Sequence, residues 1–362
     1  MNKTTFLITL FLSLYAVLNA QNKTENLIII TLDGTRWQEV FTGADSLLIR
    51  TKEQTKDTAA FLKKYWRNTP EDRRRALMPF LWGTLASQGQ IYGNRHAGNL
   101  VNVSNHMWFS FPGYSEILCG FADDERINSN NPVNNPNTHV LEFLHAKPAF
   151  NGKIATFSSW DAFPFIINEK RSGIPVNSGF EPVSGDNLTE NEVLLNSLMR
   201  KIPEFIGGVR NDAITFYLGF EYLKKNNPKV LYIALDETDD LAHDSRYDLY
   251  LNAISYSDQM IAELWDWIQK SPVYKNKTTL MITVDHGRGI GLSDWKSHGI
   301  KIPHSDETWF AVMGPDTPAK GEIKTAGQIY NSQYASTLAG FLGFNYSNVK
   351  PVGAKIAEVL SK

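Results

Sequence analysis

Cysteine is almost absent from this chain of 362 residues, and its scarcity limits how the fold can be stabilised. Cys119 is the only cysteine, so an internal disulfide bond is excluded. If the protein is exported, its stability must come from a hydrophobic core and from bound metal ions. A chain of this kind fits a bacterial periplasm better than an animal secretion, in which disulfides are common.

A large excess of charge of either sign is also missing. The formal net charge is -2, and the densest basic stretch, Arg73 to Arg75, directly follows Glu71 and Asp72. This pattern is typical of a solvated helix face, so we expect no binding of duplex nucleic acid. The sequence contains no internal repeat and no low-complexity tract, and no feature of it predicts a protein partner. With 42% hydrophobic residues, the chain can bury one large core.

The N-terminal segment contains an apolar run, Phe6 to Leu18, which follows Lys3 and precedes a small residue, Ala20. This pattern predicts a signal peptide over residues 1–20 and a single domain over residues 21–362. The run is short for a bilayer span, although an uncleaved anchor is the alternative. We therefore expect an exported protein, periplasmic or secreted from a bacterium, without stable membrane insertion after cleavage.

Three runs rich in Leu, Ile and Val end in acidic residues: LIIITLD at Asp33, VLYIALDETDDLAH around Asp239, and LMITVDHG at Asp285. Two further short buried strands are expected at 153–157 and 308–313. Helix-like apolar spacing covers 55–65, 76–85 and 248–268, whereas the composition of 121–137 and 172–187 predicts loops. Alternating strands and helices predict an α/β fold with a mostly parallel central sheet and helices on both faces. The carboxylates would then meet at the carboxyl edge of the sheet.

Histidines follow two of the acidic residues at sequence spacings that suit metal binding. Asp239 and His243 are four residues apart and would share one helical face. A surface hydrogen bond is the ordinary explanation of such a pair, but Asp236, Asp240 and Asp244 crowd the same loop, and so much like charge favours a cation. We choose Asp239 as the ligand, with Asp236 second.

The pair Asp285 and His286 is a more specific signal, because Gly287 and Gly289 let the backbone turn sharply after it. Aspartate oxygens and histidine nitrogens are ligands that zinc accepts. Two such ions about 4 Å apart can hold the attacking and leaving oxygens of a phosphoryl displacement. The three motifs together therefore indicate a hydrolase with two divalent ions, for which we expect zinc.

A nucleophile is available in the segment FSFPGYSEILCG, which contains Ser110 and Ser115. The order of Asp33, Ser110, Asp239 with His243, Asp285 with His286 and a later His-Gly resembles the alkaline phosphatase superfamily, especially its nucleotide pyrophosphatase/phosphodiesterase branch. There the nucleophile is a Thr in a T-F-P-N-H-type motif, ten residues before a Gly. Ser110 keeps that distance to Gly120. Ser115, in GYSE, resembles instead the nucleophile motif of cofactor-independent phosphoglycerate mutases and stays the alternative.

The resemblance also implies how the metal ligands divide. Asp239, His243 and a third histidine would hold one ion, and Asp33, Asp285, His286 and the Ser110 oxygen the other. For the third histidine we choose His298, which precedes Gly299 as the family's ligand precedes a glycine. His304, in IPHSDETW, is the alternative.

The sequence departs from the family pattern in two places. Gly113 stands where the phosphodiesterase branch has an asparagine that holds a phosphate oxygen, so Asn105, Trp160 or a backbone amide would have to replace it. Tyr114 stands where sulfatases of the Cys/Ser-X-Pro-X-Arg type have arginine, which disfavours the usual sulfatase activity. We therefore expect hydrolysis of a small phosphate ester, monoester or diester, through a phospho-serine intermediate. A phosphotransferase of the same superfamily and a non-catalytic metal-binding module are the alternatives.

Overall fold

The computed structural model describes residues 23–202 and 207–361. The expected signal peptide at residues 1–20 lies outside this part of the chain. No helix within the described residues is both long enough and apolar enough to cross a membrane.

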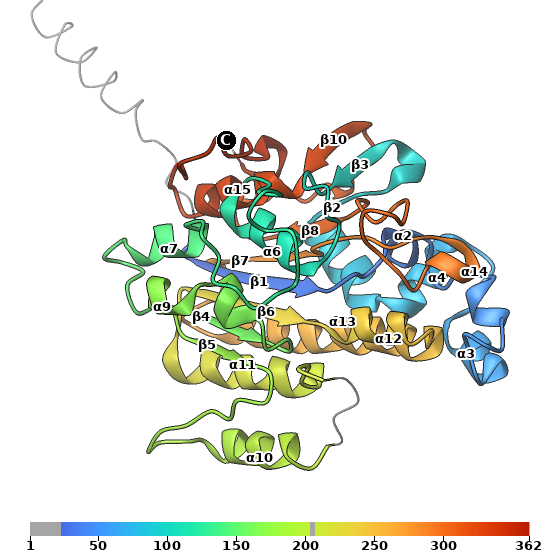
Figure 1. Ribbon diagram of the computed structural model, residues 1–362, viewed down its shortest axis with the longest axis horizontal. Coiled ribbons are helices and arrows are strands. Elements are labelled where there is room, and N and C mark those ends of the chain that lie inside the picture. The colour runs from blue at the N-terminus through green and yellow to red at the C-terminus, as the bar shows by residue number, and fades with distance from the viewer. Residues whose placement is uncertain (1–22, 203–206, 362) are drawn as a thin grey trace, which may run out of the picture.

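The centre of the molecule is a sheet of eight strands in the order β5-β4-β6-β1-β7-β8-β2-β9 (Figure 1). A separate pair, β3 and β10, runs parallel beside it. The strands are β1 (Asn26–Leu32), β2 (Gly89–Tyr92), β3 (Asn99–Asn102), β4 (Ile154–Ser158), β5 (Val176–Ser178), β6 (Val230–Leu235), β7 (Thr278–Thr283), β8 (Phe310–Met313), β9 (Gly321–Glu322) and β10 (Gly327–Tyr330).

The three central strands β6, β1 and β7 are buried along their whole length. Their sequences are nearly continuous runs of Leu, Ile, Val and Thr, as expected for parallel strands covered on both faces. Alternate residues of β1 enter different halves of the core, with Ile28 and Ile30 on one side of the sheet and Leu27 and Ile29 on the other. The mostly parallel sheet predicted from the sequence is confirmed.

Helices cover both faces (Figure 1). The face of Ile28 packs against α2 (Trp37–Thr42), α3 (Thr58–Tyr65), α4 (Pro70–Leu77), α11 (Asp212–Asn226), α12 (Glu237–His243) and α13 (Tyr247–Lys270). The face of Leu27 packs against α6 (Ser110–Cys119), α7 (Val140–His145), α8 (Phe163–Ile166) and α15 (Tyr334–Phe341). The shorter elements are η2 (Leu48–Arg50), η3 (Leu81–Leu85), α5 (Ala86–Gln88), η4 (Arg95–Ala97), α9 (Glu169–Ser172), α10 (Glu190–Met199), α14 (Gly291–Asp294), η5 (Asn331–Gln333) and η6 (Ala357–Val359).

One strand of the main sheet runs in the opposite direction to the others. Strand β8 pairs antiparallel with both β7 and β2, whereas every other pairing in the sheet is parallel. Because β7 ends at the carboxyl edge, β8 begins at that same edge. The connection between them, residues 284–309, therefore has both its ends at one edge of the sheet.

Two sequence expectations differ from the structure in detail. The helix expected over 76–85 is interrupted, because α4 ends at Leu77 and η3 begins at Leu81. The carboxylate of Asp258 accepts the backbone N–H groups of Phe80 and Leu81 at this break. The loop expected over 172–187 contains β5, whose three residues are too few to show a periodic pattern.

Candidate metal centre

The register of the central strands places three aspartates side by side. Leu32 pairs with Leu235 and Thr31 pairs with Thr283. Continuing the same registers aligns Asp33 with Asp236 on one side and with Asp285 on the other. The three strand ends thus lie at the same carboxyl edge, where parallel α/β sheets form their ligand sites. Asp236, the second choice from the sequence, stands at the end of β6, and the chosen ligand Asp239 follows it in α12.

The first cluster consists of Asp33, Asp285, His286 and Ser110. The Nε2 atom of His286 lies 3.2 Å from Oδ1 of Asp33 and 3.4 Å from Oδ2 of Asp285. The hydroxyl oxygen of Ser110 lies 3.4 Å from the same nitrogen. All four side chains are buried. One histidine nitrogen, two carboxylates and a hydroxyl therefore converge on one point.

The orientation of His286 is fixed by the backbone. Its Nδ1 atom lies 2.9 Å from the carbonyl oxygen of Gly287, to which it donates, so Nε2 carries the lone pair that faces the carboxylates. A Cβ atom at Gly287 would lie 2.2 Å from the backbone oxygen of Glu307. Only glycine permits this close approach, which explains the Asp-His-Gly sequence in physical terms.

The second cluster consists of Asp239, His243 and His298. The Nε2 atom of His243 lies 3.0 Å from Oδ2 of Asp239 and 3.0 Å from Nε2 of His298. His298 lies 3.5 Å from Oδ1 of Asp239, and its Nδ1 contacts the backbone oxygen of Trp108 at 3.2 Å. This contact leaves Nε2 of His298 free to coordinate an ion.

The two clusters adjoin, because His286 Nε2 lies 3.7 Å from Oδ1 of Asp239. His286, Asp239 and His298 can therefore also be grouped as one set of ligand atoms. We assign His286 to the first cluster, since its distances to Asp33 and Asp285 are shorter.

The separations within each cluster fit tetrahedral coordination. An ion with bonds of about 2.0–2.1 Å to nitrogen and oxygen holds its ligands about 3.3–3.4 Å apart. The atom pairs above are separated by 3.0 to 3.5 Å. The donors are oxygen and nitrogen, as divalent zinc accepts. Both clusters therefore have the donor set and the spacing that an ion requires.

The electrostatics of the first cluster also favour a cation. Burial raises the pKa of Asp33 well above its usual value, and the charge of Asp239 raises it further. Burial and the charge of Asp33 do the same to the pKa of Asp285. Oδ1 of Asp33 and Oδ2 of Asp285 are buried and have no hydrogen-bond partner among the described residues. An ion between them would supply the missing partner for both oxygens.

Asp239 differs from these two aspartates because an arginine accompanies it. Burial opposes its ionisation, but the nearby charge of Arg288 holds its pKa well below the usual range. The guanidinium of Arg288 is buried, and its Nε atom has no partner among the described residues. Sequence reasoning missed Arg288, although its position two residues after His286 in the same loop was the available signal.

Helix α6 places Ser110 in the site. Ser110 is the first residue of this helix, which is buried throughout. A Cβ atom at Gly113 would lie 2.3 Å from the backbone oxygen of Asp285, so glycine is needed where the helix packs against the end of β7. One turn of helix away from Ser110, the hydroxyl of Tyr114 donates to Oδ2 of Asp33 at 2.8 Å. Tyr114 was also missed as a contact of the metal-ligand set.

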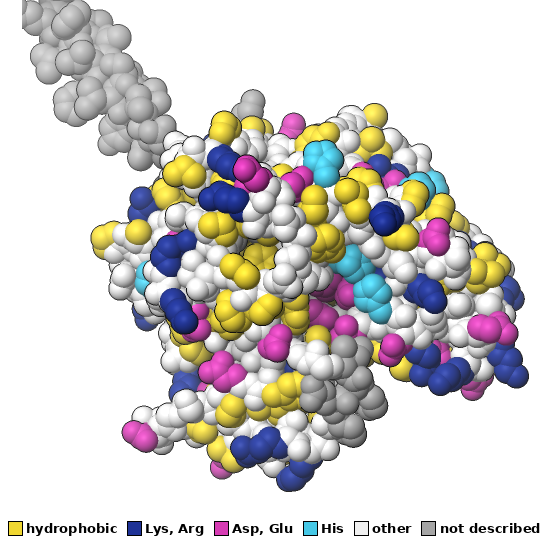
Figure 2. Space-filling view, viewed as in Figure 1, with side chains coloured by type: hydrophobic (Ala, Val, Ile, Leu, Met, Phe, Trp, Pro, Cys, Tyr) yellow, Lys and Arg dark blue, Asp and Glu magenta, His cyan; other side chains and the backbone are white. Residues whose placement is uncertain are grey.

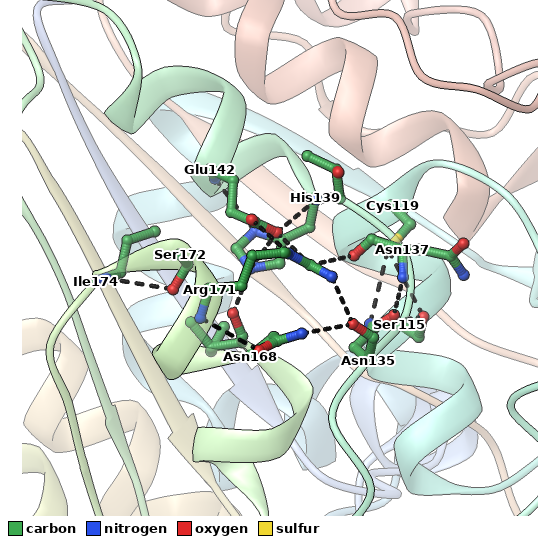
Figure 3. Close-up of polar contacts among 12 residues, drawn as sticks. Ser115, Cys119, Asn135, Asn137, His139, Glu142, Asn168, Arg171, Ser172 and Ile174 are labelled. Carbon is green, nitrogen blue, oxygen red and sulfur yellow. Dashed lines mark hydrogen bonds and ion pairs between the residues drawn. The ribbon is translucent and has the colours of Figure 1, made fainter.

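The alternative nucleophile, Ser115, points away from both clusters. It lies within α6, where its hydroxyl accepts from Nδ2 of Asn135 at 3.1 Å and contacts Cys119. Figure 3 shows it in a polar network that joins α6 to α7 and α9. The Asn135 carbonyl accepts from both Asn168 and Arg171 in that network. Ser115 therefore has a structural role.

His304 and Asn105 both lie outside the two clusters. His304 is 41% exposed at its side chain and contacts Glu307 at 3.0 Å, so it does not replace His298 as the third histidine. The amide of Asn105 donates to Glu116 and its oxygen accepts two backbone N–H groups, so Asn105 builds the turn before α6.

The structure brings together every residue that the sequence predicted as a metal ligand or nucleophile. These residues come from the ends of β1 and β7, from the first turn of α6, from α12 and from the connection between β7 and β8. They are Asp33, Ser110, Asp239, His243, Asp285, His286 and His298.

The second cluster is the more open of the two. The side chain of His243 is 45% exposed, whereas that of His286 is fully buried. Figure 2 shows histidine side chains beside a recess lined by acidic ones. Helix α12 also borders a cavity of about 490 Å³, lined by Glu237 and Asp240 among others. None of the seven predicted site residues lines this cavity, so it is separate from the two clusters.

Comparison with known proteins finds a matching family. A family model described as Sulfatase matches residues 100–344. A search of curated proteins by sequence finds no match.

The fold is shared with several solved structures. The lipoteichoic acid synthase LtaP from Listeria monocytogenes is 14% identical with a TM-score of 0.55, over 94% of this chain and 76% of that one. The wild-type alkaline phosphatase PafA is 10% identical with a TM-score of 0.59, over 94% and 99% of the two chains. BT1596, described as a 2-O GAG sulfatase, is 15% identical with a TM-score of 0.52, over 94% and 75%.

Proposed function

Because this chain belongs to the Sulfatase family, within the alkaline phosphatase superfamily of metal-dependent enzymes, we propose that it is a hydrolase of small phosphate esters with Ser110 as its nucleophile. The observation that carries the proposal is the position of the Ser110 hydroxyl, 3.4 Å from His286 Nε2 and at the start of α6. A hydroxyl held among metal ligands has the activated position that nucleophilic catalysis requires.

The residues of both clusters would hold two divalent ions, for which zinc fits the donor set. Such ions lower the pKa of a bound hydroxyl and stabilise charge on oxygen when they are present. The Ser110 hydroxyl loses its proton to solvent and its oxygen attacks phosphorus, the bond to the leaving alcohol breaks, and the alcohol departs with a proton from solvent. Water then cleaves the phospho-serine ester and restores the hydroxyl, which releases phosphate from a monoester substrate or a phosphate monoester from a diester. In this scheme Tyr114 and Arg288 hold Asp33 and Asp239 in place.

A sulfate ester is the second candidate substrate, because the family is described as Sulfatase. Tyr114 argues against it. It stands where the Cys/Ser-X-Pro-X-Arg pattern has arginine, and its hydroxyl is committed to Asp33. The segment around Ser110 therefore favours an unmodified serine as the nucleophile, rather than a serine converted to formylglycine as in sulfatases.

The test compares three chromogenic esters on the purified mature protein: p-nitrophenyl phosphate, bis-p-nitrophenyl phosphate and p-nitrophenyl sulfate. We expect turnover of one or both phosphate esters that disappears on chelation and returns with zinc. Ser110→Ala should lower kcat by at least about 1,000-fold, since no other hydroxyl replaces the nucleophile. Ser115→Ala is the matched control, because it removes a hydroxyl from the same helix outside the site.

The outcomes separate the candidates. Turnover of the sulfate ester alone would replace the phosphatase proposal by the sulfatase one. Equal losses in Ser110→Ala and Ser115→Ala, with both variants folded, would remove Ser110 from its role. The preferred phosphate ester decides between monoesterase and diesterase activity.

The place of action follows from the expected signal peptide. We propose that residues 1–20 direct export and that the enzyme works in the periplasm or outside the cell. The mass of the protein recovered from a bacterial periplasmic fraction tests this. A mature chain that begins near Gln21 supports export, whereas an intact N-terminus in the cytoplasmic fraction contradicts it.

A further inference from the structure

The three residues directly before Ser110 are large and apolar. Met107, Trp108 and Phe109 are half-buried, and none of them packs against the hydrophobic core formed by the described residues. They therefore form an apolar surface beside the proposed nucleophile that the stability of the core does not require. Apolar surface of this kind, with polar groups around it, is typical of a binding site.

The backbone of Trp108 is strained. Its φ angle is 55°, a left-handed conformation that a bulky residue rarely adopts. Oδ1 of Asn105 accepts the backbone N–H groups of Met107 and Trp108 at 3.1 and 3.0 Å. Two hydrogen bonds of 2.8 Å to Glu116 hold Asn105 in turn. Strain of this kind persists only where the surrounding contacts enforce it, and it is concentrated at functional sites.

Trp108 also links the two clusters. Its carbonyl oxygen accepts from Nδ1 of His298 at 3.2 Å, and Ser110 follows it by two residues. Among the described residues, the indole N–H of Trp108 has no acceptor and its ring stacks on no other aromatic ring. The backbone is thus tightly fixed, whereas the side chain has no polar or aromatic partner of its own. The indole is available to a ligand.

A second apolar residue lies close to His298. Ile300 follows it by two residues, and its side chain is 57% exposed. A Cβ atom at Gly299 would lie 3.9 Å from the backbone oxygen of Met107, so this turn lies against the segment that carries Trp108. The two apolar segments therefore meet beside His298. Figure 2 shows hydrophobic side chains at the border of the recess next to the histidines.

The direction of the reaction places the leaving group on this side of the site. Ser110 belongs to the first cluster, so that cluster holds the attacking oxygen. In an in-line displacement between two ions, the leaving oxygen departs opposite the nucleophile and next to the other ion. His298 belongs to the cluster that would hold this other ion, and it contacts Trp108. The alcohol part of the ester therefore lies beside Trp108.

From this geometry we propose that the natural substrate is a phosphate ester of an apolar alcohol, and that Trp108 is the residue that selects it, with Ile300 beside it. The proposal rests on the proposed function of the site. An apolar alcohol loses contact with water when it packs against these two side chains, which favours its binding. A polyhydroxy alcohol such as glycerol would instead lose water from its hydroxyl groups without gaining partners there.

The test compares hexyl phosphate with glycerol phosphate on the zinc-loaded protein. Their alcohols differ in polarity, and neither is a chemically activated leaving group like p-nitrophenol. We expect kcat/KM to be at least about tenfold higher for hexyl phosphate. If the chromogenic esters show that the enzyme prefers diesters, the methyl diesters of the same two alcohols take their place. Equal values, or a preference for the glycerol ester, would overturn the substrate class and leave the proposed function intact.

Trp108→Gly is the decisive variant, because glycine adopts the left-handed conformation readily and only the indole is lost. We expect the ratio of the two kcat/KM values to fall by about tenfold. The zinc content should match that of the wild type, since the carbonyl that contacts His298 remains. Ile300→Ser should lower the same ratio by about threefold without changing the melting temperature, because Ile300 is exposed.

Trp66→Gly is the matched control. Trp66 is also half-buried, but its ring lies against Arg50 and Arg73. This variant should keep the wild-type ratio. If Trp108 serves only stability, Trp108→Gly will lower the melting temperature and both kcat/KM values together. An unchanged ratio of this kind would overturn the selecting role of Trp108.

Direct binding separates this proposal from the proposed function. Calorimetric titration with hexylphosphonate and with 2,3-dihydroxypropylphosphonate needs no turnover, because neither compound has an ester bond. Binding of hexylphosphonate that is at least about tenfold tighter in the wild type, and not in Trp108→Gly, supports the substrate class even if the esters react slowly. Equal binding of the two phosphonates would overturn it. A wild type that turns over no ester and binds neither phosphonate would overturn the proposed function, and the substrate class with it.

Discussion

Arg288 donates a hydrogen bond of 2.9 Å to the backbone oxygen of Asp239 and also pairs with the carboxylate of the same residue. Both contacts fix the direction in which that carboxylate points. Arg288 pairs with Oδ1, and the other carboxylate oxygen of Asp239, Oδ2, lies 3.0 Å from Nε2 of His243. A partner of this kind orients a metal ligand without touching the metal.

Arg288→Met should therefore lower the affinity of the second cluster for zinc by about 10–100-fold, the usual effect of losing such a partner. Competition with a chromogenic chelator measures it. Arg74→Met is the matched control, because Arg74 is also a buried arginine but pairs with Glu322. It should destabilise the protein yet leave zinc affinity unchanged. Equal affinity in wild type and Arg288→Met would contradict the orienting role.

Metal stoichiometry provides a second prediction. The wild type should bind two zinc ions for each chain, and Asp285→Asn and His243→Ala should each bind one, since they remove a ligand from different clusters. Elemental analysis by mass spectrometry after dialysis measures this directly. His304→Ala should still bind two, because His304 contacts Glu307 and neither cluster. A single shared ion would instead give one in the wild type and none in both ligand variants.

Gly113→Ala should separate α6 from the end of β7. The added methyl group would lie 2.3 Å from the backbone oxygen of Asp285, so the helix must move. We expect a loss of about 1–3 kcal/mol in the free energy of unfolding, as for other overpacked sites, and a lower kcat because Ser110 moves with the helix. Urea denaturation and steady-state kinetics measure the two effects.

Gly83→Ala is the control for this glycine, since nothing lies within 4 Å of a Cβ atom there. It should leave kcat unchanged. If Gly113→Ala is equally harmless, then α6 is held less tightly against β7 than the contact indicates.

Asp258 should make stability depend on pH. Burial raises its pKa to about 7, although two backbone N–H groups donate to it. The folded state then holds a proton that the unfolded state has already lost. The resulting stabilisation is complete below about pH 4 and is lost as the pH rises towards 7, with a total of at most about 4 kcal/mol.

The measurement is the difference in unfolding free energy between wild type and Asp258→Asn at several pH values. The wild type should lose stability relative to the variant between pH 4 and 7, because asparagine does not titrate. Asp266→Asn, which removes an exposed carboxylate from the same helix, is the control. A difference that stays constant with pH would show that Asp258 is ionised throughout this range.

The sequence predicted the parts of the fold that depend on local patterns. The strands before Asp33, Asp236 and Asp285 are fully buried, so each is a continuous apolar run that can be recognised alone. The direction of β8 could not be predicted, because a run of four buried residues has the same pattern in both directions. Strands β5 and β9 are too short to carry a period.

The same limit explains which site residues were missed. The ligands share short motifs, such as the four-residue spacing of Asp239 and His243. The contact of Tyr114 with Asp33 joins two segments that only the folded chain brings together. Nothing in the local sequence of a tyrosine marks it as the partner of a distant aspartate.

The reversed strand β8 has a consequence for how this site can vary. His286, Arg288 and His298 all lie in the connection between β7 and β8, and both ends of that connection are at the same edge of the sheet. Residues can be inserted there, or removed, without shifting any strand against its neighbour. The depth of the entrance to the site can therefore be remodelled, by natural divergence or by protein engineering, independently of the scaffold beneath it.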